Sequence, residues 1–83
     1  MEYSDLNIEN LEQPTIGNLI KEMRLELKLS QEQFASNLGV SFTSINRWEN
    51  HKTMPSMLAL RMLSLYLKQL GERGNQIFKR VLC

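Results

Sequence analysis

The chain has 83 residues, 42% of them hydrophobic and 23% charged, with a formal net charge of +1. This length allows one domain with a modest core, and the composition is that of an ordinary globular protein. A disulfide framework is excluded because Cys83 is the only cysteine, and a reducing, cytoplasmic compartment is therefore expected. No apolar run reaches the roughly 18 residues that a membrane span requires.

Charge is divided unevenly along the chain. Residues 1–13 contain four acidic groups and no lysine or arginine, whereas the remainder contains ten basic and five acidic groups. We therefore expect an acidic N-terminal extension, residues 1–13, followed by a mildly basic domain, residues 14–83. The extension is expected to be a mobile tail or a loosely docked segment, because it also carries the apolar residues Tyr3, Leu6, Ile8 and Leu11. A basic domain is compatible with a polyanionic partner.

A first helix is predicted over residues 16–28. Thr15, after Pro14, has the side chain of an N-cap residue. Apolar residues then recur at the i, i+3, i+4, i+7 spacing of one helical face. They are Ile16, Leu19, Ile20, Met23 and Leu27.

Two short helices are predicted next, over residues 31–38 and 42–50. Ser30 and Gln33 have the spacing of a capping box, and Gly39 is suited to end the first of these helices in a left-handed conformation. Ser41 is the expected N-cap of the second. Two short helices joined by a tight turn that contains a glycine are typical of a helix-turn-helix.

The predicted helix 42–50 has two different sides. At about 100° per residue, Ile45 and Trp48 lie together on one side, which must pack on the core. The opposite arc, about 140° wide, carries amide, hydroxyl, guanidinium and aromatic groups. Its members are Phe42, Thr43, Asn46, Arg47 and Asn50. This side is either a solvated surface or a contact surface, and the shortage of Glu and Lys favours contact.

The C-terminal part is predicted to form helices 56–69 and 74–82, which makes the chain an all-α bundle of four to five short helices. The helix 56–69 is apolar over most of its circumference and therefore needs more than one buried contact. One contact is the core. The other is the last helix, a second copy of the chain, or both, and we expect both.

From Ile16 to Leu70, about two-thirds of the chain, the sequence resembles the phage repressor and Cro-like (XRE) helix-turn-helix family. The resemblance rests on "TIGNLIKEMRLELKLSQEQFASNLGVSFTSINRWEN", then "K" and "PS". It implies a lambda repressor-like bundle that binds double-stranded DNA, with the second helix of the motif in the major groove, commonly as a dimer on a palindromic site. A homodimer through the fourth helix and the C-terminal segment is expected.

The resemblance also implies roles for individual residues. Four residues match base-facing positions: Phe42, Thr43, Asn46 and Arg47. Arg47 can pair with guanine and Asn46 with adenine, while Phe42 would pack on a thymine methyl or else fold back onto the domain. Phosphate contacts are expected from Gln31, Ser41, Asn50 and Lys52, and Thr43 could also make one.

Two further features follow from the family pattern. Arg24 and Glu49 match a structural ion pair that links the first helix to the end of the reading helix. The chain departs from the family at His51, where many members have glycine. Either His51 or Asn50 is expected in the left-handed conformation, which makes the geometry of loop 50–55 less certain.

An enzymatic role is not expected, because the chain lacks a nucleophile–histidine–acid set, a glycine-rich phosphate loop and a cluster of metal ligands. No metal site and no cofactor are predicted. The leading hypothesis is a sequence-specific DNA-binding transcriptional regulator, most simply a repressor. The alternatives are an antitoxin with the same DNA-binding domain and a protein (toxin) partner, and an interaction adaptor that does not read DNA.

Overall fold

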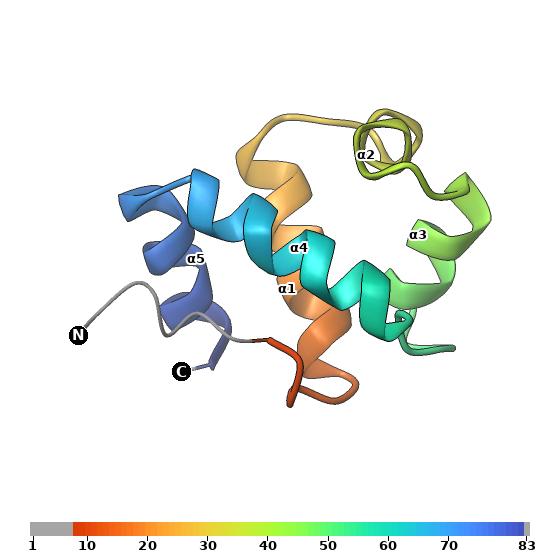
Figure 1. Ribbon diagram of the computed structural model, residues 1–83, viewed down its shortest axis with the longest axis horizontal. Helices are drawn as coiled ribbons and strands as arrows, with labels where there is room; N and C mark the ends of the chain where they lie inside the picture. The colour runs from red at the N-terminus through yellow and green to blue at the C-terminus, as the bar shows by residue number, and fades with distance from the viewer. Residues whose placement is uncertain (1–7, 83) are drawn as a thin grey trace.

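The computed structural model describes residues 8–82, which form a bundle of five helices (Figure 1). The helices are α1 (Thr15–Glu26), α2 (Gln31–Leu38), α3 (Phe42–Glu49), α4 (Met57–Gln69) and α5 (Glu72–Leu82). Within residues 8–82 there is no strand, so the predicted all-α class is confirmed. None of the helices in this part of the chain is long and apolar enough to cross a membrane.

The first helix differs at both ends from its prediction. Pro14 is the N-cap residue and makes no side-chain cap, so the prediction that Thr15 caps α1 is wrong. Instead, the Gln13 side-chain oxygen accepts a hydrogen bond from the Gly17 N–H, at 3.0 Å. The helix ends at Glu26, two residues early, because Lys28 takes a left-handed conformation with φ 58° that no α-helix can contain.

The helix-turn-helix forms by the local signals that the sequence contains. Ser30 and Gln33 make the reciprocal capping box at the start of α2. Gly39 ends α2 with φ 74°, and the Ser41 hydroxyl accepts the Ser44 N–H at 3.1 Å to cap α3. The side chains at the helix starts accept N–H groups that would otherwise lack partners, and the Gly39 N–H donates to the Ser36 carbonyl at the end of α2.

The two C-terminal helices close the bundle. Ser56 is the N-cap of α4, which crosses in front of α1 (Figure 1), and α5 begins at Glu72, two residues earlier than predicted. Ion pairs of Arg73 with Glu26 and of Arg80 with Glu22 show that α5 runs antiparallel to α1. Gly74 lets the backbones of α4 and α5 approach, because a Cβ there would overlap the Leu67 carbonyl.

The core lies between these helices and includes a residue from before α1. Its fully buried side chains include Phe34, Ile45 and Leu63, and Phe34 packs edge-on against Tyr66 with 5.5 Å between ring centroids. Ile8 is fully buried in the same cluster, and Leu11 packs against it. Of the expected extension, residues 8–13 therefore follow the docked alternative, and residues 1–7 lie outside the described residues.

Candidate nucleic-acid interface

The orientation of α3 separates a buried side from an exposed side. Ile45 is fully buried and Trp48 is 6% exposed, so both anchor the helix on the core. Thr43 and Arg47 are exposed on the other side, and Phe42 is 47% exposed. The Phe42 ring is thus partly covered by the domain, and the exposed part is available to a partner.

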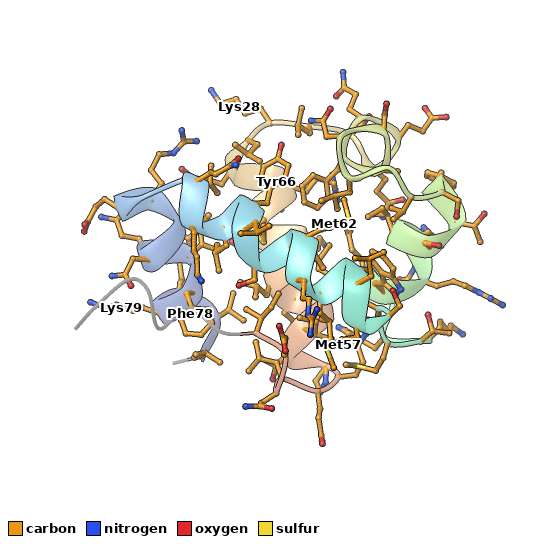
Figure 2. The ribbon with its side chains drawn as sticks, in the orientation of Figure 1. Lys28, Met57, Met62, Tyr66, Phe78 and Lys79 are labelled. Atoms are coloured by element: carbon orange, nitrogen blue, oxygen red, sulfur yellow. The ribbon has the colours of Figure 1, made fainter. Side chains whose placement is uncertain are left out.

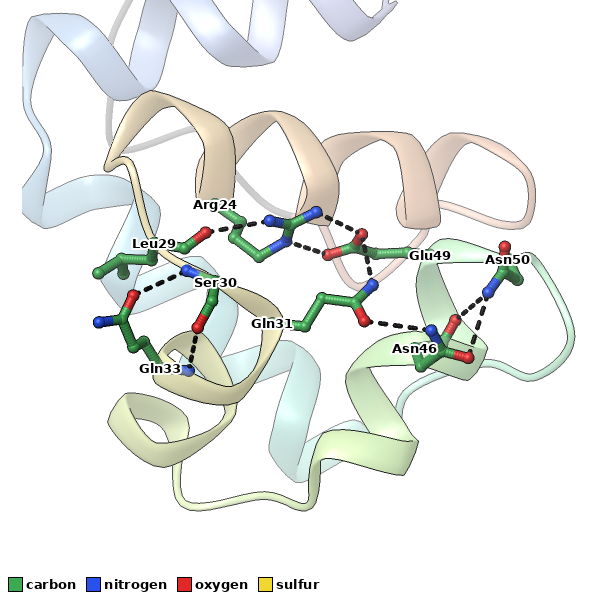
Figure 3. Close-up of polar contacts among 8 residues, drawn as sticks. All are labelled: Arg24, Leu29, Ser30, Gln31, Gln33, Asn46, Glu49 and Asn50. Carbon is green, nitrogen blue, oxygen red and sulfur yellow. Dashed lines mark hydrogen bonds and ion pairs between the residues drawn. The ribbon is translucent and has the colours of Figure 1, made fainter.

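The base-facing candidate Asn46 is half-buried and is brought against the phosphate candidate Gln31 (Figure 3). The Asn46 amide nitrogen donates to Gln31 Oε1 at 3.1 Å, and Gln31 Nε2 donates to Glu49 Oε1 at 3.0 Å. Each amide nitrogen carries two hydrogens, so each keeps one for a further acceptor. The contacts therefore hold both side chains in place without using all of their donors.

The Arg24–Glu49 ion pair expected from the resemblance is present and nearly buried. Arg24 Nε and a terminal guanidinium nitrogen donate to the two Glu49 oxygens at 2.8 and 3.0 Å. The remaining terminal nitrogen of Arg24 donates to the Leu29 carbonyl at 3.0 Å. The side chains are 13% and 5% exposed, so the pair is shielded from water. It joins α1, the α1–α2 turn and the last turn of α3 (Figure 3).

The pair alters the acid–base behaviour of the arginine. The pKa of Arg24 is raised, chiefly because its guanidinium donates hydrogen bonds to Glu49, while burial acts in the opposite direction. Arg24 therefore keeps its positive charge at any pH at which the protein would be studied.

The remaining phosphate candidates lie around the ends of α3. Ser41 is exposed, and its hydroxyl both caps α3 and lies 2.9 Å from the Ser44 hydroxyl. The exposed Asn50 donates from its amide nitrogen to the Asn46 backbone carbonyl at 2.9 Å and to Asn46 Oδ1 at 3.3 Å. Lys52 is exposed in the loop that follows α3.

Sequence reasoning did not identify the contact between α1 and the loop after α3. Gly17 faces the end of α3, where a Cβ would overlap the Trp48 carbonyl and come within 2.7 Å of His51. His51, with φ 62°, takes the left-handed conformation, and its Nε2 lies 3.0 Å from Asn18 Oδ1. A glycine inside a helix lowers the stability of that helix by about 1 kcal/mol relative to alanine. The presence of Gly17 in a predicted helix was therefore the one feature of the sequence that indicated close packing here. Gln13, which also contacts this loop, carried no signal.

The groups exposed on this surface are suited to recognition of a partner. The exposed side of α3 offers a guanidinium, a hydroxyl, an aromatic ring and two side-chain amides. The Asn46 amide is hydrogen-bonded to Gln31 of α2, and the Asn50 amide is hydrogen-bonded to Asn46. Within residues 8–82, no three His, Cys, Asp or Glu side chains are placed to hold a metal ion. The width of one helix and the extended, directional side chains on it fit a DNA major groove.

Comparison with known proteins agrees with this geometry. A family model described as "Helix-turn-helix" matches residues 20–72, which is more than half of the chain. The chain therefore belongs to the helix-turn-helix family of Cro/repressor-like (XRE) domains, a family of DNA-binding regulators. No solved structure matches the chain.

Two relatives share the segment. The chain is 38% identical over 47 residues to the HTH-type transcriptional activator BcrR of Enterococcus faecalis, a match over 57% of this chain and 23% of that protein. It is 42% identical over 48 residues to the type II methyltransferase M1.ScrFI of Lactococcus lactis subsp. cremoris, over 54% of this chain and 12% of that protein. The chain thus spans less than a quarter of the length of either relative.

Proposed function

We propose that the protein is a sequence-specific, double-stranded DNA-binding transcriptional regulator that reads its site with α3. The observation that carries the proposal is the orientation of this helix: Ile45 and Trp48 are buried, and the opposite side projects from the domain. Membership of the helix-turn-helix family and the similarity to a protein named as a transcriptional activator support it.

Direct base contacts are proposed for the exposed side of α3. Arg47 is assigned to guanine O6 and N7, and Asn46 to adenine, with its amide aligned by Gln31. Thr43 and Phe42 are assigned to neighbouring base edges, where the Phe42 ring would pack on a thymine methyl. Removing one such bidentate contact is expected to cost about 1–3 kcal/mol and to relax preference at one base pair.

Phosphate contacts are proposed for the groups at the ends of the motif. Gln31 lies in the first turn of α2, where free N–H groups and the helix dipole attract anions. Ser41 lies at the start of α3, Asn50 lies at its end, and Lys52 lies just beyond it. Such contacts orient the domain on the duplex and carry no sequence information directly.

We further propose that the regulator acts as a homodimer on a palindromic operator and represses where that operator overlaps a promoter. The α4 face, which we define as Met57, Leu58, Met62 and Leu65, is the surface proposed for dimerisation. Leu58 is 70% exposed and Leu65 is 60% exposed, one above the other at i, i+7 spacing. Met57 and Met62 follow the same helix across the front of the molecule (Figure 2).

Met62 is half-buried against the core, but Met57, Leu58 and Leu65 are exposed. These three side chains support a symmetric contact, because exposed apolar surface is costly in water unless a partner covers it. In Figure 1, α3 lies at one end of the molecule and α4 crosses its front. A second copy packed on the α4 face therefore leaves α3 free for DNA.

Selection from a pool of random duplexes tests the proposal. The folded protein is expected to enrich a two-fold symmetric sequence with half-sites about one helical turn, 10–10.5 base pairs, apart. Binding should weaken steeply as salt is raised, since counterions are released from the phosphates. Failure to enrich any sequence at low ionic strength would refute sequence-specific DNA binding.

A further inference from the structure

One side chain from before α1 joins three backbone segments. Gln13 Nε2 donates to the Trp48 carbonyl at 3.1 Å and to the Thr53 carbonyl at 2.8 Å. Gln13 Oε1 accepts the Gly17 N–H at 3.0 Å. Both ends of the amide are thus used to connect the first turn of α1, the last turn of α3 and the loop that follows α3.

The loop is held at the same place by other contacts. The His51 N–H donates to the Trp48 carbonyl at 3.1 Å, and the Lys52 N–H donates to the Arg47 carbonyl at 2.9 Å. Gln13 therefore shares the Trp48 acceptor with the loop itself. The absence of a Cβ at Gly17 allows this close approach. The position of loop 50–53 therefore depends both on its contacts with the first turn of α1 and on the hydrogen bonds of its own turn.

Gln13 is itself held in position by the segment that precedes it. Ile8 is fully buried in the core, and Leu11 packs against that core. Glu9 Oε2 lies 3.7 Å from Arg61 Nε of α4. This segment lies outside residues 20–72, the part that matches the family model.

We propose that Gln13 is a positioning residue for DNA binding: it fixes loop 50–53 against α1 and so places Lys52 against a DNA phosphate. The inference rests on the proposed DNA-binding function. Gln13 does not touch the duplex in this scheme. It acts through the two carbonyl groups that it binds, and through the loop backbone that carries the lysine.

A purely structural role predicts a different pattern. If Gln13 only caps α1, its loss would lower the stability of the fold and leave the loop and the affinity of the folded protein unchanged. The two roles use different atoms, because the cap uses Oε1 and the loop contacts use Nε2. Gln13→Glu keeps an acceptor for Gly17 and removes both donors to the loop, whereas Gln13→Ala removes all three contacts.

The experiment uses the full chain in four forms: the wild type, Gln13→Ala, Gln13→Glu and the control Gln76→Ala. Gln76 is an exposed glutamine of α5, on the polar side of that helix. Circular dichroism first establishes that each form is folded at the temperature of measurement. The amide hydrogen exchange of residues 51–53 is then measured without DNA. The affinity for the duplex most enriched from random sequences is measured for each form, with and without the additional change Lys52→Ala.

In both Gln13 variants the backbone N–H of Lys52 is expected to exchange with solvent at least about threefold faster. The affinity for the duplex is expected to fall about three- to tenfold, which corresponds to the free energy of one hydrogen bond. Lys52→Ala should weaken the wild type and the control, and should weaken the Gln13 variants much less, because the two changes remove the same contact. The logarithmic salt slope should fall by about one in the Gln13 variants.

Unchanged exchange in both variants, or faster exchange with unchanged affinity and salt slope, would overturn the proposal. Equal losses from Lys52→Ala in all backgrounds would overturn it as well. If the wild type binds no duplex, it is the proposed function that fails. In that case the exchange data still decide whether Gln13 holds the loop.

Discussion

Removal of the Arg24 guanidinium is expected to be the most damaging single change to a charged residue in this fold. Arg24→Met keeps the aliphatic stem but deletes three donors, two to Glu49 and one to the Leu29 carbonyl. The Glu49 carboxylate, 5% exposed, would retain only the hydrogen bond from Gln31 among those in Figure 3. Breaking a buried pair by removing one partner costs about 3–5 kcal/mol.

That cost is large for a chain of this size. Domains have stabilities of about 0.05–0.15 kcal/mol per residue, which is about 4–12 kcal/mol here. With a urea m-value near 1 kcal/mol/M, the unfolding midpoint of Arg24→Met should fall by about 3 M or more. The loss should be independent of pH over the ordinary range. The raised pKa of Arg24 means that its contribution is present below its ordinary pKa and is lost only in strong alkali.

Urea denaturation followed by circular dichroism at 222 nm measures the effect, with Arg80→Met as the matched control. Arg80 makes an ion pair with Glu22 at 3.2 Å, but the two side chains are 52% and 41% exposed. An exposed pair of this kind contributes about 0–1 kcal/mol. If Arg24→Met cost no more than Arg80→Met, the reasoning that burial makes Arg24–Glu49 decisive would be refuted.

Further predictions concern packing, DNA contacts and assembly. Gly17→Ala should cost several kcal/mol in denaturant unfolding, since its Cβ would overlap the backbone at the end of α3, whereas Gly39→Ala, with φ 74° and open space, should cost about 1 kcal/mol. Equal costs would contradict the close approach. Arg47→Ala should relax preference at one base pair, and Lys52→Ala should weaken binding equally to all sequences, both measured by titration of matched and altered duplexes. Leu65→Asp should give a folded monomer in sedimentation equilibrium, and a dimer that persists would rule out the α4 face as the interface.

Local sequence signals predicted the helix-turn-helix itself. The Ser30–Gln33 capping box, the left-handed Gly39 and the Ser41 cap all appear as predicted, because each depends on residues at most three or four positions apart. The same reasoning failed at Thr15. There the donor at the start of α1 is satisfied by Gln13, which precedes a proline and did not resemble a cap. The assigned DNA contacts remain predictions.

The sequence by itself determined which side of α3 faces inward, because Ile45 and Trp48 can be removed from water only on one side of that helix. The family resemblance also predicted the Arg24–Glu49 ion pair that links α3 to α1. Only the tertiary structure decided the other polar contacts that hold the helix in place. Asn46 meets Gln31 across 15 positions, and Gln13 meets the Trp48 and Thr53 carbonyls across 35 and 40. Hydrophobic periodicity describes one helix at a time, whereas these polar contacts depend on the distance between elements after the core has packed.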